Sequence, residues 1–495
     1  MQQKSTFFFQ RIWPALFLLI GGALLTYTSL RAYGLSMTHD ESSTFLNGID
    51  QPLWRCFFSP ECWGTANMHL TNTFLMQLSV GIFGISGWAV RLPNLLGHLV
   101  YLIFSYRLVR SLTDDKPLQL GSFVLLSFHP YLLEFFAVSR GYGLACSGLM
   151  VTFYYLLRYQ AEGQKKYAWY YSLGLAFAVM SNFTFLLLYA AVGGALMLGI
   201  GFREKSLQAI WQEKAQFYPW LTVGVGLALL LYKPLSFLRA GGEFSYGTDT
   251  LWESYQFFIM DTIQGEGYFG AVNREVFMGI GLALMLGAGW LVIQHRDRIF
   301  QGTSGRFFAI GLLVTGLIVL MMVLQYYLLG TKYLRNRTAI MFVPLGALCY
   351  SLFLMQWGRI QRLAAQITIG VLAAFAAFHL LRAGNQESVR EWAYDAQTHA
   401  MIQYMTEKEA AEPIRLGMHW YFTHASNFYV QAEEIEKLEP IIYEKELRVN
   451  DYYHYYYVRP EDVGTLAEFY EVERAFGRVG VLLRKKLATN ARIKD

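Results

Sequence analysis

The chain has 495 residues, of which 54% are hydrophobic and only 16% are charged, and its net charge is +5. A soluble protein usually carries about a quarter of charged residues, so this composition excludes an ordinary soluble globular protein. The Lys and Arg residues lie in short loops between apolar stretches and form no continuous basic face, so we expect no nucleic-acid partner.

Apolar stretches of about 17–25 residues recur along the chain, and that length crosses roughly 30 Å of hydrocarbon as a helix. They predict a polytopic α-helical membrane protein with about eleven spans. The long apolar run 168–202 is divided into two spans at residues 181–183, which read SNF. The expected spans lie near 13–30, 90–108, 118–135, 143–158, 168–182, 184–202, 218–235, 276–294, 307–329, 338–356 and 365–381.

Alternate loops are rich in Lys and Arg, which places them, with the N-terminus, on the cytoplasmic side by the positive-inside rule. Within the first outer loop, residues 69–88 are apolar enough to span, but a span there would move Arg107 and Arg110 outside. We therefore expect an interfacial helix at 69–88. The expected outer segments are 31–89, 136–142, 236–275, 330–337 and everything after 382.

The chain becomes polar and charged after about residue 384. We expect residues 1–384 to form a transmembrane domain and residues 385–495 a small α/β domain outside the cytoplasm. The run YYHYYYV at 452–458 fits either a packed strand or an aromatic surface that stacks sugars. The expected elements of this tail are a helix around 389–410 and strands at 414–420, 452–458 and 478–485.

The four cysteines match no metal-binding pattern. Cys146 and Cys349 lie within apolar spans, where buried free thiols are expected. Cys56 and Cys62 share the first outer loop and can form a disulfide if that loop lies outside the cytoplasm, but their spacing leaves this open.

An acidic pair, Asp40 and Glu41, follows His39 at the outer end of the first span. Such a triplet is often only a solvated helix start, in which Asp40 or Ser42 caps the helix. The triplet lies at the boundary between lipid and water, and three other outer boundaries also carry ionisable residues. This shared position favours a functional role as well.

These boundaries allow a structural and a functional reading. Arg140 lies in the short outer connection 136–142 and Glu134 at the outer end of the preceding helix, where an ion pair between them would join two helices. Arginines at an outer boundary can extend toward lipid phosphates, or they can bind one specific phosphate with paired N–H groups. The ionisable residues at the other two boundaries are Arg91, ahead of Pro93, and the group Lys332, Arg335 and Arg337.

The order of these segments resembles the GT-C membrane glycosyltransferases, in particular the branch that contains protein O-mannosyltransferases and the bacterial lipid A aminoarabinose transferase. The acidic motif of that family's first outer loop is matched by Asp40-Glu41. The family's histidine segment is matched by NMHLTNTFLM, which keeps His69 but lacks the family's prolines. The remaining matches are VRLPNLLG at 90–97, Arg140-Gly141-Tyr142 for an R-x-Y motif, and KYLRNRTAIMFVPL at 332–345.

The resemblance implies a glycosyltransferase that moves a hexosyl or pentosyl group from a polyprenyl-phosphate carrier to an acceptor hydroxyl, with inversion, at the outer face of a bacterial inner membrane. The acceptor is a glycan, a lipid or a protein. Asp40 is the expected general base, and Glu41 is the expected second catalytic carboxylate. The residues expected to bind substrates are His69, Arg91, Glu134, Arg140, Tyr142, Lys332, Arg335 and Arg337.

No cofactor is expected, and the alternative is a divalent metal held by His39, Asp40, Glu41 and His69. Two other functions stay open. A transporter or flippase would place ionisable residues near the middle of the membrane, whereas here they gather at one boundary. An envelope-polymer polymerase or ligase would use arginines in a large outer loop, and the loop 236–275 carries Arg239 and Arg274.

Overall fold

The computed structural model describes residues 2–52, 55, 69–204, 214–409 and 412–486. The cysteine pair Cys56 and Cys62 lies outside the described residues. The chain divides into two compact units. The membrane unit comprises Met1–Ser29, Leu53–Leu75 and Pro93–Gly384, and the tail unit comprises Leu30–Pro52, Met76–Leu92 and Asn385–Asp495.

Eight helical segments of the described chain are long and apolar enough to cross a membrane. A bent pair, α6 (Lys116–Ser127) and α7 (Pro130–Ala137), makes a ninth if the two helices, inclined by 59°, count as one span. The protein is therefore a polytopic membrane protein, as the composition predicts. The eight segments lie in α1 (Gln2–Gly34), α5 (Gly87–Leu112), α10 (Leu186–Glu204), α12 (Lys214–Ala240), α14 (Asn273–Gln294), α16 (Gly302–Leu329), α17 (Phe342–Trp357) and α18 (Arg362–Ala383).

Two of the eleven expected spans form helices outside this set. They are α8 (Gly141–Glu162) and α9 (Lys165–Ser181), of which α9 has only 17 residues. Glycines let them pack closely, because a Cβ on Gly148 would lie 2.8 Å from the carbonyl oxygen of Gly174. The expected break at 181–183 is confirmed, since α9 ends at Ser181 and a short 3-10 turn precedes α10.

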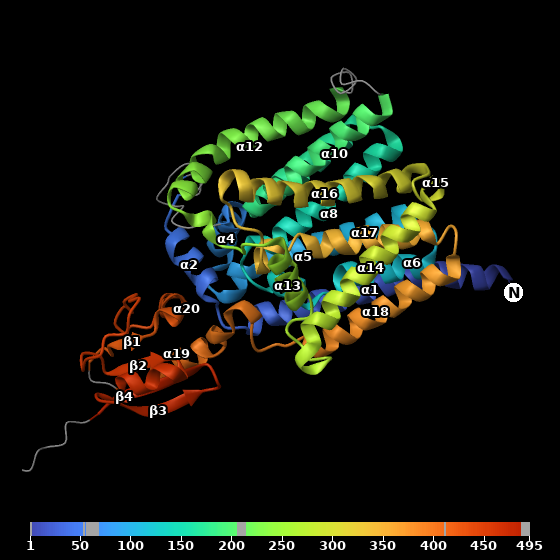
Figure 1. The fold of residues 1–495 in the computed structure, drawn as a ribbon. Coiled ribbons are helices and arrows are strands. Elements are labelled where there is room, and N and C mark those ends of the chain that lie inside the picture. The colour runs from blue at the N-terminus through green and yellow to red at the C-terminus, as the bar shows by residue number, and fades with distance from the viewer. Residues whose placement is uncertain (1, 53–54, 56–68, 205–213, 410–411, 487–495) are drawn as a thin grey trace, which may run out of the picture. The chain divides into compact units, whose positions relative to one another are not determined.

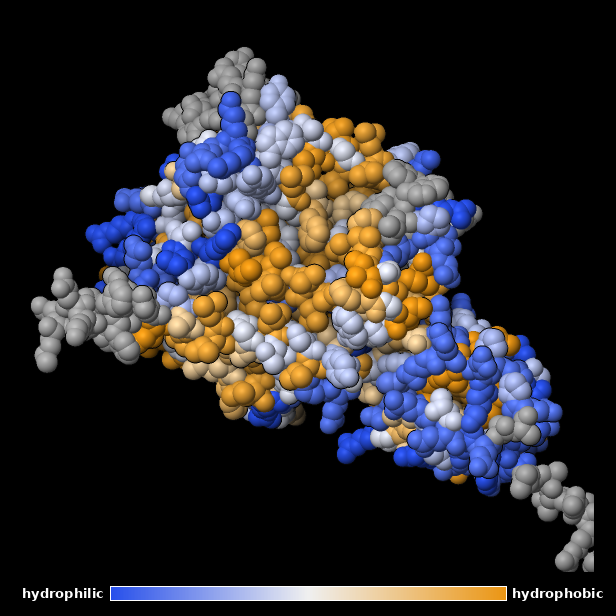
Figure 2. All heavy atoms as spheres, turned by 180° about the vertical axis from the view of Figure 1, so that it is seen from behind, coloured by the Kyte–Doolittle hydropathy of each residue, from blue (hydrophilic) through white to orange (hydrophobic). Residues whose placement is uncertain are grey.

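The helices of the membrane unit pack side by side, with α16 against α10, α17 and α8 (Figure 1). Figure 2 shows large apolar areas on the outside of this unit, as expected for helices that face lipid. Leucines such as Leu18, Leu229 and Leu286 are more than 70% exposed there. Within the expected interfacial segment, the chain forms the 14-residue apolar helix α4 (Leu70–Phe83), and its place relative to the bilayer stays a prediction.

The tail unit contains a four-stranded sheet in the order β1-β2-β4-β3. The strands are β1 (Leu416–Met418), β2 (Tyr455–Val458), β3 (Tyr470–Phe476) and β4 (Gly480–Lys485). β1 pairs with β2 in parallel, and the other pairs are antiparallel. The small C-terminal α/β domain is therefore confirmed, with β1, β2 and β4 in the three expected segments.

The tyrosine-rich run of β2 is a packed strand. Tyr457 is fully buried against one face of the sheet, while Tyr453 and Tyr456 are buried in a second cluster on the other. Their rings are therefore not available as a surface for stacking sugars. Of the two readings of YYHYYYV, packing describes these three residues.

Two helices of the tail unit, α19 (Thr398–Thr406) and α20 (Trp420–Ala432), share a hydrophobic core with the sheet. Two more, η6 (Arg390–Gln397) and α2 (His39–Gly48), pack on α20. α2 packs on α20 through Phe45 and Phe428, whose ring centroids are 5.0 Å apart. Arg31, near the end of α1, donates hydrogen bonds to the carbonyls of Asn385 and Ser388. The segment after the first span is thus folded into the same unit as the tail.

Candidate active site

Asp40 lies in the first turn of α2. This helix begins with a capping box, in which Thr38 Oγ1 accepts from the N–H of Glu41 and Glu41 Oε2 accepts from the N–H of Thr38. The N-cap is therefore Thr38 and not Asp40 or Ser42. Asp40 itself is partly exposed.

Glu41 faces away from solvent and pairs with Arg91. Both side chains are fully buried, with Nε–Oε1 at 2.9 Å and Nη2–Oε2 at 2.8 Å. The three remaining N–H groups of Arg91 donate to the carbonyl oxygens of Ala32, Leu35 and Ser36. Since a guanidinium has five N–H donors, Arg91 has none left for a phosphate. The geometry therefore gives Glu41 and Arg91 a structural role, in place of the expected catalytic and substrate-binding roles.

The buried carboxyl of Asp395 supports the same turn. Its Oδ2 accepts from the backbone N–H of His39 at 2.6 Å, and its side chain is 1% exposed. Burial raises the pKa of Asp395 well above its usual value, and the charges of Asp40 and Glu41 raise it further. Asp395 could not be predicted from the sequence, because the tail contains no segment that matches a motif of the family. Only the fold brings this residue next to α2.

Aromatic rings surround the start of α2. The His39 ring lies 4.6 Å from His424 and 5.6 Å from Trp420, and His424 stacks on Tyr443 at 5.1 Å. Burial lowers the pKa of His424 to about 4, with a further lowering by His39 and an opposing effect of the Asp40 charge. Asp40 is thus close enough to affect His424, whose ring is neutral at physiological pH.

A second cluster lies in the membrane unit. The ring of His69 lies 4.8 Å from that of Tyr142, and His69 donates a hydrogen bond to the carbonyl of Ser181. Burial lowers the pKa of His69 well below its usual value, and the charges of Arg140 and Arg337 lower it further. Four of the predicted substrate-binding residues therefore come together here.

The glycine between Arg140 and Tyr142 is required by this packing. A Cβ on Gly141 would lie 1.9 Å from the carbonyl oxygen of Ser181 and 2.8 Å from the His69 ring. Arg140 itself is fully buried just before α8. The close approach of the backbone at Gly141 therefore sets how near Arg140 and Tyr142 lie to His69.

Two buried amide side chains, Asn72 and Asn94, link the helices around this cluster. Asn72 donates to the carbonyl of Ser139, at 3.1 Å, and Asn94 donates to Asn72 Oδ1 at 2.7 Å. This chain of bonds links α4 and α5 to the connection before α8. Glu134 is 4% exposed on α7, next to the same connection.

The other basic residues of the late outer segment have partners in the loop 241–272. Lys332 forms an ion pair with Asp249, and the hydrogen bond to that carboxylate raises the Lys332 pKa. Arg335 stacks over Phe257, with its Cζ 4.2 Å from the ring centroid. Arg337 also lies near this loop, with its Cζ 5.8 Å from the ring centroid of Tyr246, and it is the member of the expected basic group whose charge acts on His69.

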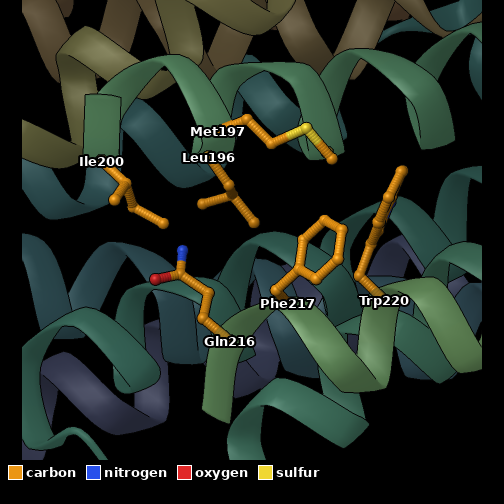
Figure 3. Close-up of a pocket in the computed structure, with 7 residues that line it drawn as sticks. Leu196, Met197, Ile200, Gln216, Phe217 and Trp220 are labelled. Carbon is orange, nitrogen blue, oxygen red and sulfur yellow. The ribbon is translucent and has the colours of Figure 1, made fainter. Parts of the chain in front are cut away.

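Among the described residues, neither a metal-binding group nor an apolar cavity adds to the two clusters. No group of three or more His, Cys, Asp or Glu side chains that could hold a metal occurs among them. A small apolar cavity lies between α10 and α12 (Figure 3), and no ionisable side chain lines it. Its labelled lining residues are Leu196, Met197, Ile200, Gln216, Phe217 and Trp220.

Part of the chain matches a known protein family. Residues 70–237 match the family model described as dolichyl-phosphate-mannose-protein mannosyltransferase, and this range includes Arg91, Glu134, Arg140 and Tyr142. No curated protein matches the chain. The family match covers neither Asp40 nor the tail.

Two solved structures of one protein share the architecture over almost the whole chain. The apo crystal structure of ArnT from Cupriavidus metallidurans has a TM-score of 0.55 at 10% identity, over 95% of this chain and 97% of that chain. The same protein bound to undecaprenyl phosphate has a TM-score of 0.50 at 12% identity, over 96% and 98%. The arabinosyltransferase EmbB from Mycobacterium smegmatis has a TM-score of 0.42 at 12% identity, over 68% and 30%. The resemblance drawn from the motifs is confirmed at the level of the fold: the chain is a membrane protein of the GT-C glycosyltransferase fold, and its residues 70–237 match the mannosyltransferase family model.

Proposed function

We propose that the protein transfers a sugar from a polyprenyl-phosphate carrier to an acceptor hydroxyl at the outer face of a bacterial inner membrane. The observation that carries this proposal is the pair of guanidinium groups, Arg140 and Arg337, whose charges act on the buried His69. Positive charge at a buried position suits a phosphate, which guanidinium groups contact with paired N–H donors. The similarity of the fold to ArnT, solved with undecaprenyl phosphate, supports a carrier of this class.

The reaction requires a base and a site for the leaving phosphate. Asp40 accepts the proton of the acceptor hydroxyl as its oxygen attacks the anomeric carbon, and the bond from that carbon to the phosphate oxygen breaks. The leaving phosphate gains negative charge, so fixed guanidinium groups stabilise the transition state more than the ground state. A single displacement inverts the configuration at the anomeric carbon. The N-terminus is cytoplasmic and the tail unit periplasmic in this proposal, which follows the distribution of loop charges.

The residues around Asp40 position it. Glu41, Arg91 and Thr38 fix the start of α2, and Asp395 holds the backbone of His39. These groups act through the position of the helix and do not contact the substrate in the proposal.

The test uses the purified full-length protein in nanodiscs with a panel of polyprenyl-phosphate sugars. Sugar release or transfer from one of these donors is the expected result, and Asp40→Asn should lower turnover by at least about 100-fold. Its matched control is Asp50→Asn, an exposed aspartate just after α2 that should leave turnover unchanged. Normal turnover in Asp40→Asn would remove Asp40 from the role of base. In sealed proteoliposomes, solute transport without sugar release would favour the transporter alternative.

A further inference from the structure

Four rings in the tail unit form a cluster beside Asp40. The ring cluster consists of His39, Trp420, His424 and Tyr443. His39 is held in place by a hydrogen bond between its Nδ1 and the carbonyl of Tyr421, at 2.9 Å. The cluster thus combines one residue next to Asp40 in the chain with three residues from the tail.

The ring cluster is not part of the hydrophobic core. The core face of α20 is formed by Phe422, Ala425 and Phe428, which are at most 1% exposed. Trp420 and His424 are one helical turn apart on another face and are partly exposed, and Tyr443 is 41% exposed. A cluster of aromatic rings that keeps this access to solvent can contact a ligand.

The chemistry of the cluster favours an uncharged ligand with both apolar and polar groups. None of its four members is Lys or Arg, and His424 is neutral at physiological pH because its pKa is about 4. Tyr, Trp and His rings offer an apolar face with a polar edge. A sugar ring matches this pattern, since its C–H face packs on an aromatic ring while its hydroxyl groups accept and donate hydrogen bonds. The neighbouring Asp40 carboxylate would then meet one of these hydroxyls.

We propose that the ring cluster binds a carbohydrate acceptor and presents one of its hydroxyl groups to Asp40. This inference rests on the proposed function and names the acceptor class for it. The hydroxyl proton passes to the Asp40 carboxylate, the acceptor oxygen bonds to the anomeric carbon of the donor sugar, and the polyprenyl monophosphate leaves. Trp420 and Tyr443 supply the stacking surface, and His39 and His424 supply the edge next to the base.

The experiment measures transfer from the active carrier donor to methyl glycosides of glucose, mannose, galactose and N-acetylglucosamine, and to a Ser/Thr-rich peptide. Trp420→Ala should raise the acceptor KM by about tenfold, in line with the loss of an aromatic contact of up to about 1.5 kcal/mol. Trp420→Phe should retain most of the affinity. Donor hydrolysis by water should fall much less than transfer to the glycosides in both variants, because water does not need the stacking surface.

Matched controls separate this effect from general damage. Trp252→Ala removes a Trp that is 52% exposed on α13 (Leu251–Thr262), and Tyr452→Ala removes a Tyr that is 46% exposed in the tail unit. Neither residue belongs to the ring cluster, so neither should change the acceptor KM. A Trp420→Ala variant that behaves like these controls would overturn the inference, and so would transfer to the peptide alone.

Direct binding distinguishes failure of the inference from failure of the proposed function. Titration calorimetry of the full-length protein with the same methyl glycosides needs no donor. Binding that is weakened by Trp420→Ala supports the ring cluster even if no donor is consumed, in which case only the proposed transfer fails. Donor hydrolysis without glycoside binding or transfer would keep the proposed function and reject the carbohydrate acceptor.

Discussion

Glu41 and Arg91 form a fully buried ion pair between the start of α2 and the start of α5, with two hydrogen bonds of 2.9 and 2.8 Å. Arg91 also binds three carbonyls at the end of α1. One side chain therefore joins the ends of three helices. The neighbouring Asp40 is partly exposed and lies outside this ion pair, so two carboxylates that are adjacent in the sequence have different surroundings.

Breaking this ion pair should destabilise the tail unit. Arg91→Ala leaves the Glu41 carboxylate buried without its partner, which typically costs about 3–5 kcal/mol. We expect a large fall in the thermal unfolding temperature of the purified protein. The double variant Arg91→Ala/Glu41→Ala should be far less than additive, because the two residues share one interaction. The control Arg484→Ala breaks a pair with Glu471 whose side chains are about half exposed and should cost at most about 1 kcal/mol. Equal effects of Arg91→Ala and Arg484→Ala would contradict a structural role of the buried pair.

The basic residues of the late outer segment should differ in their effect on the donor. Arg337→Ala removes a guanidinium that acts on His69, and loss of charged hydrogen bonds of about 1.5–3 kcal/mol should raise the donor KM roughly 10- to 100-fold. Lys332→Ala removes only an ion pair with Asp249 at a partly exposed position, so the donor KM should stay within about twofold. Steady-state kinetics with the active polyprenyl-phosphate sugar measures both. A larger effect of Lys332→Ala than of Arg337→Ala would contradict the assignment of phosphate binding to Arg337.

A substitution at Gly141 tests the close packing around His69 without removing a charged or polar group. Gly141→Ala places a Cβ 1.9 Å from the carbonyl oxygen of Ser181, so the connection before α8 must shift. We expect a lower unfolding temperature and a higher donor KM, since Arg140 and Tyr142 move with it. Gly346→Ala in α17 is the matched control, because a Cβ there meets no atom within 4 Å. That change should be neutral or stabilising by up to about 1 kcal/mol, as for other Gly to Ala changes within helices. A Gly141→Ala variant as stable and active as Gly346→Ala would contradict the close packing.

Most helices of the membrane unit could be predicted from the order of apolar spans and basic loops. Span length and loop charge depend on local composition, so the sequence indicates most of the helices and the break at Asn182. The strand β3 was missed because only its ends, Tyr470 and Phe476, are buried, which leaves no alternating pattern to detect. The helix α20 was missed because its aromatic residues resemble those of a strand.

The candidate site was predictable only where its residues lie at span ends. His69, Arg140 and Arg337 precede helices on the side that the loop charges mark as outer, and the structure brings them together. The role of Glu41 was not foreseen, since its partner Arg91 lies 50 residues away and only tertiary packing shows that the pair is buried. Asp395 and Trp420 lie in a tail without motif matches, and they reach α2 through the packing of α20 and η6.

Asp395 should make the stability of the protein depend on pH. Burial raises its pKa well above the usual 3.8, and the charges of Asp40 and Glu41 add to the shift. The native state therefore keeps a proton that the unfolded state has lost, in the pH range between the unfolded and the folded pKa. The stability contributed by this group is fully present below the unfolded pKa and is lost as the pH rises through the folded pKa.

Asp395→Asn removes this titration while its side-chain oxygen can still accept the hydrogen bond from the N–H of His39. We expect the variant to unfold at a higher temperature than the wild type at pH 7, and at nearly the same temperature near pH 4. Thermal unfolding from pH 4 to pH 8 measures the difference, with Asp50→Asn as an exposed control that should show none. A constant difference over the whole range would mean that the Asp395 carboxyl does not titrate with folding. If the variant instead loses stability as the pH rises, the ionised carboxylate stabilises the start of α2, and its pKa would have to be lowered by folding.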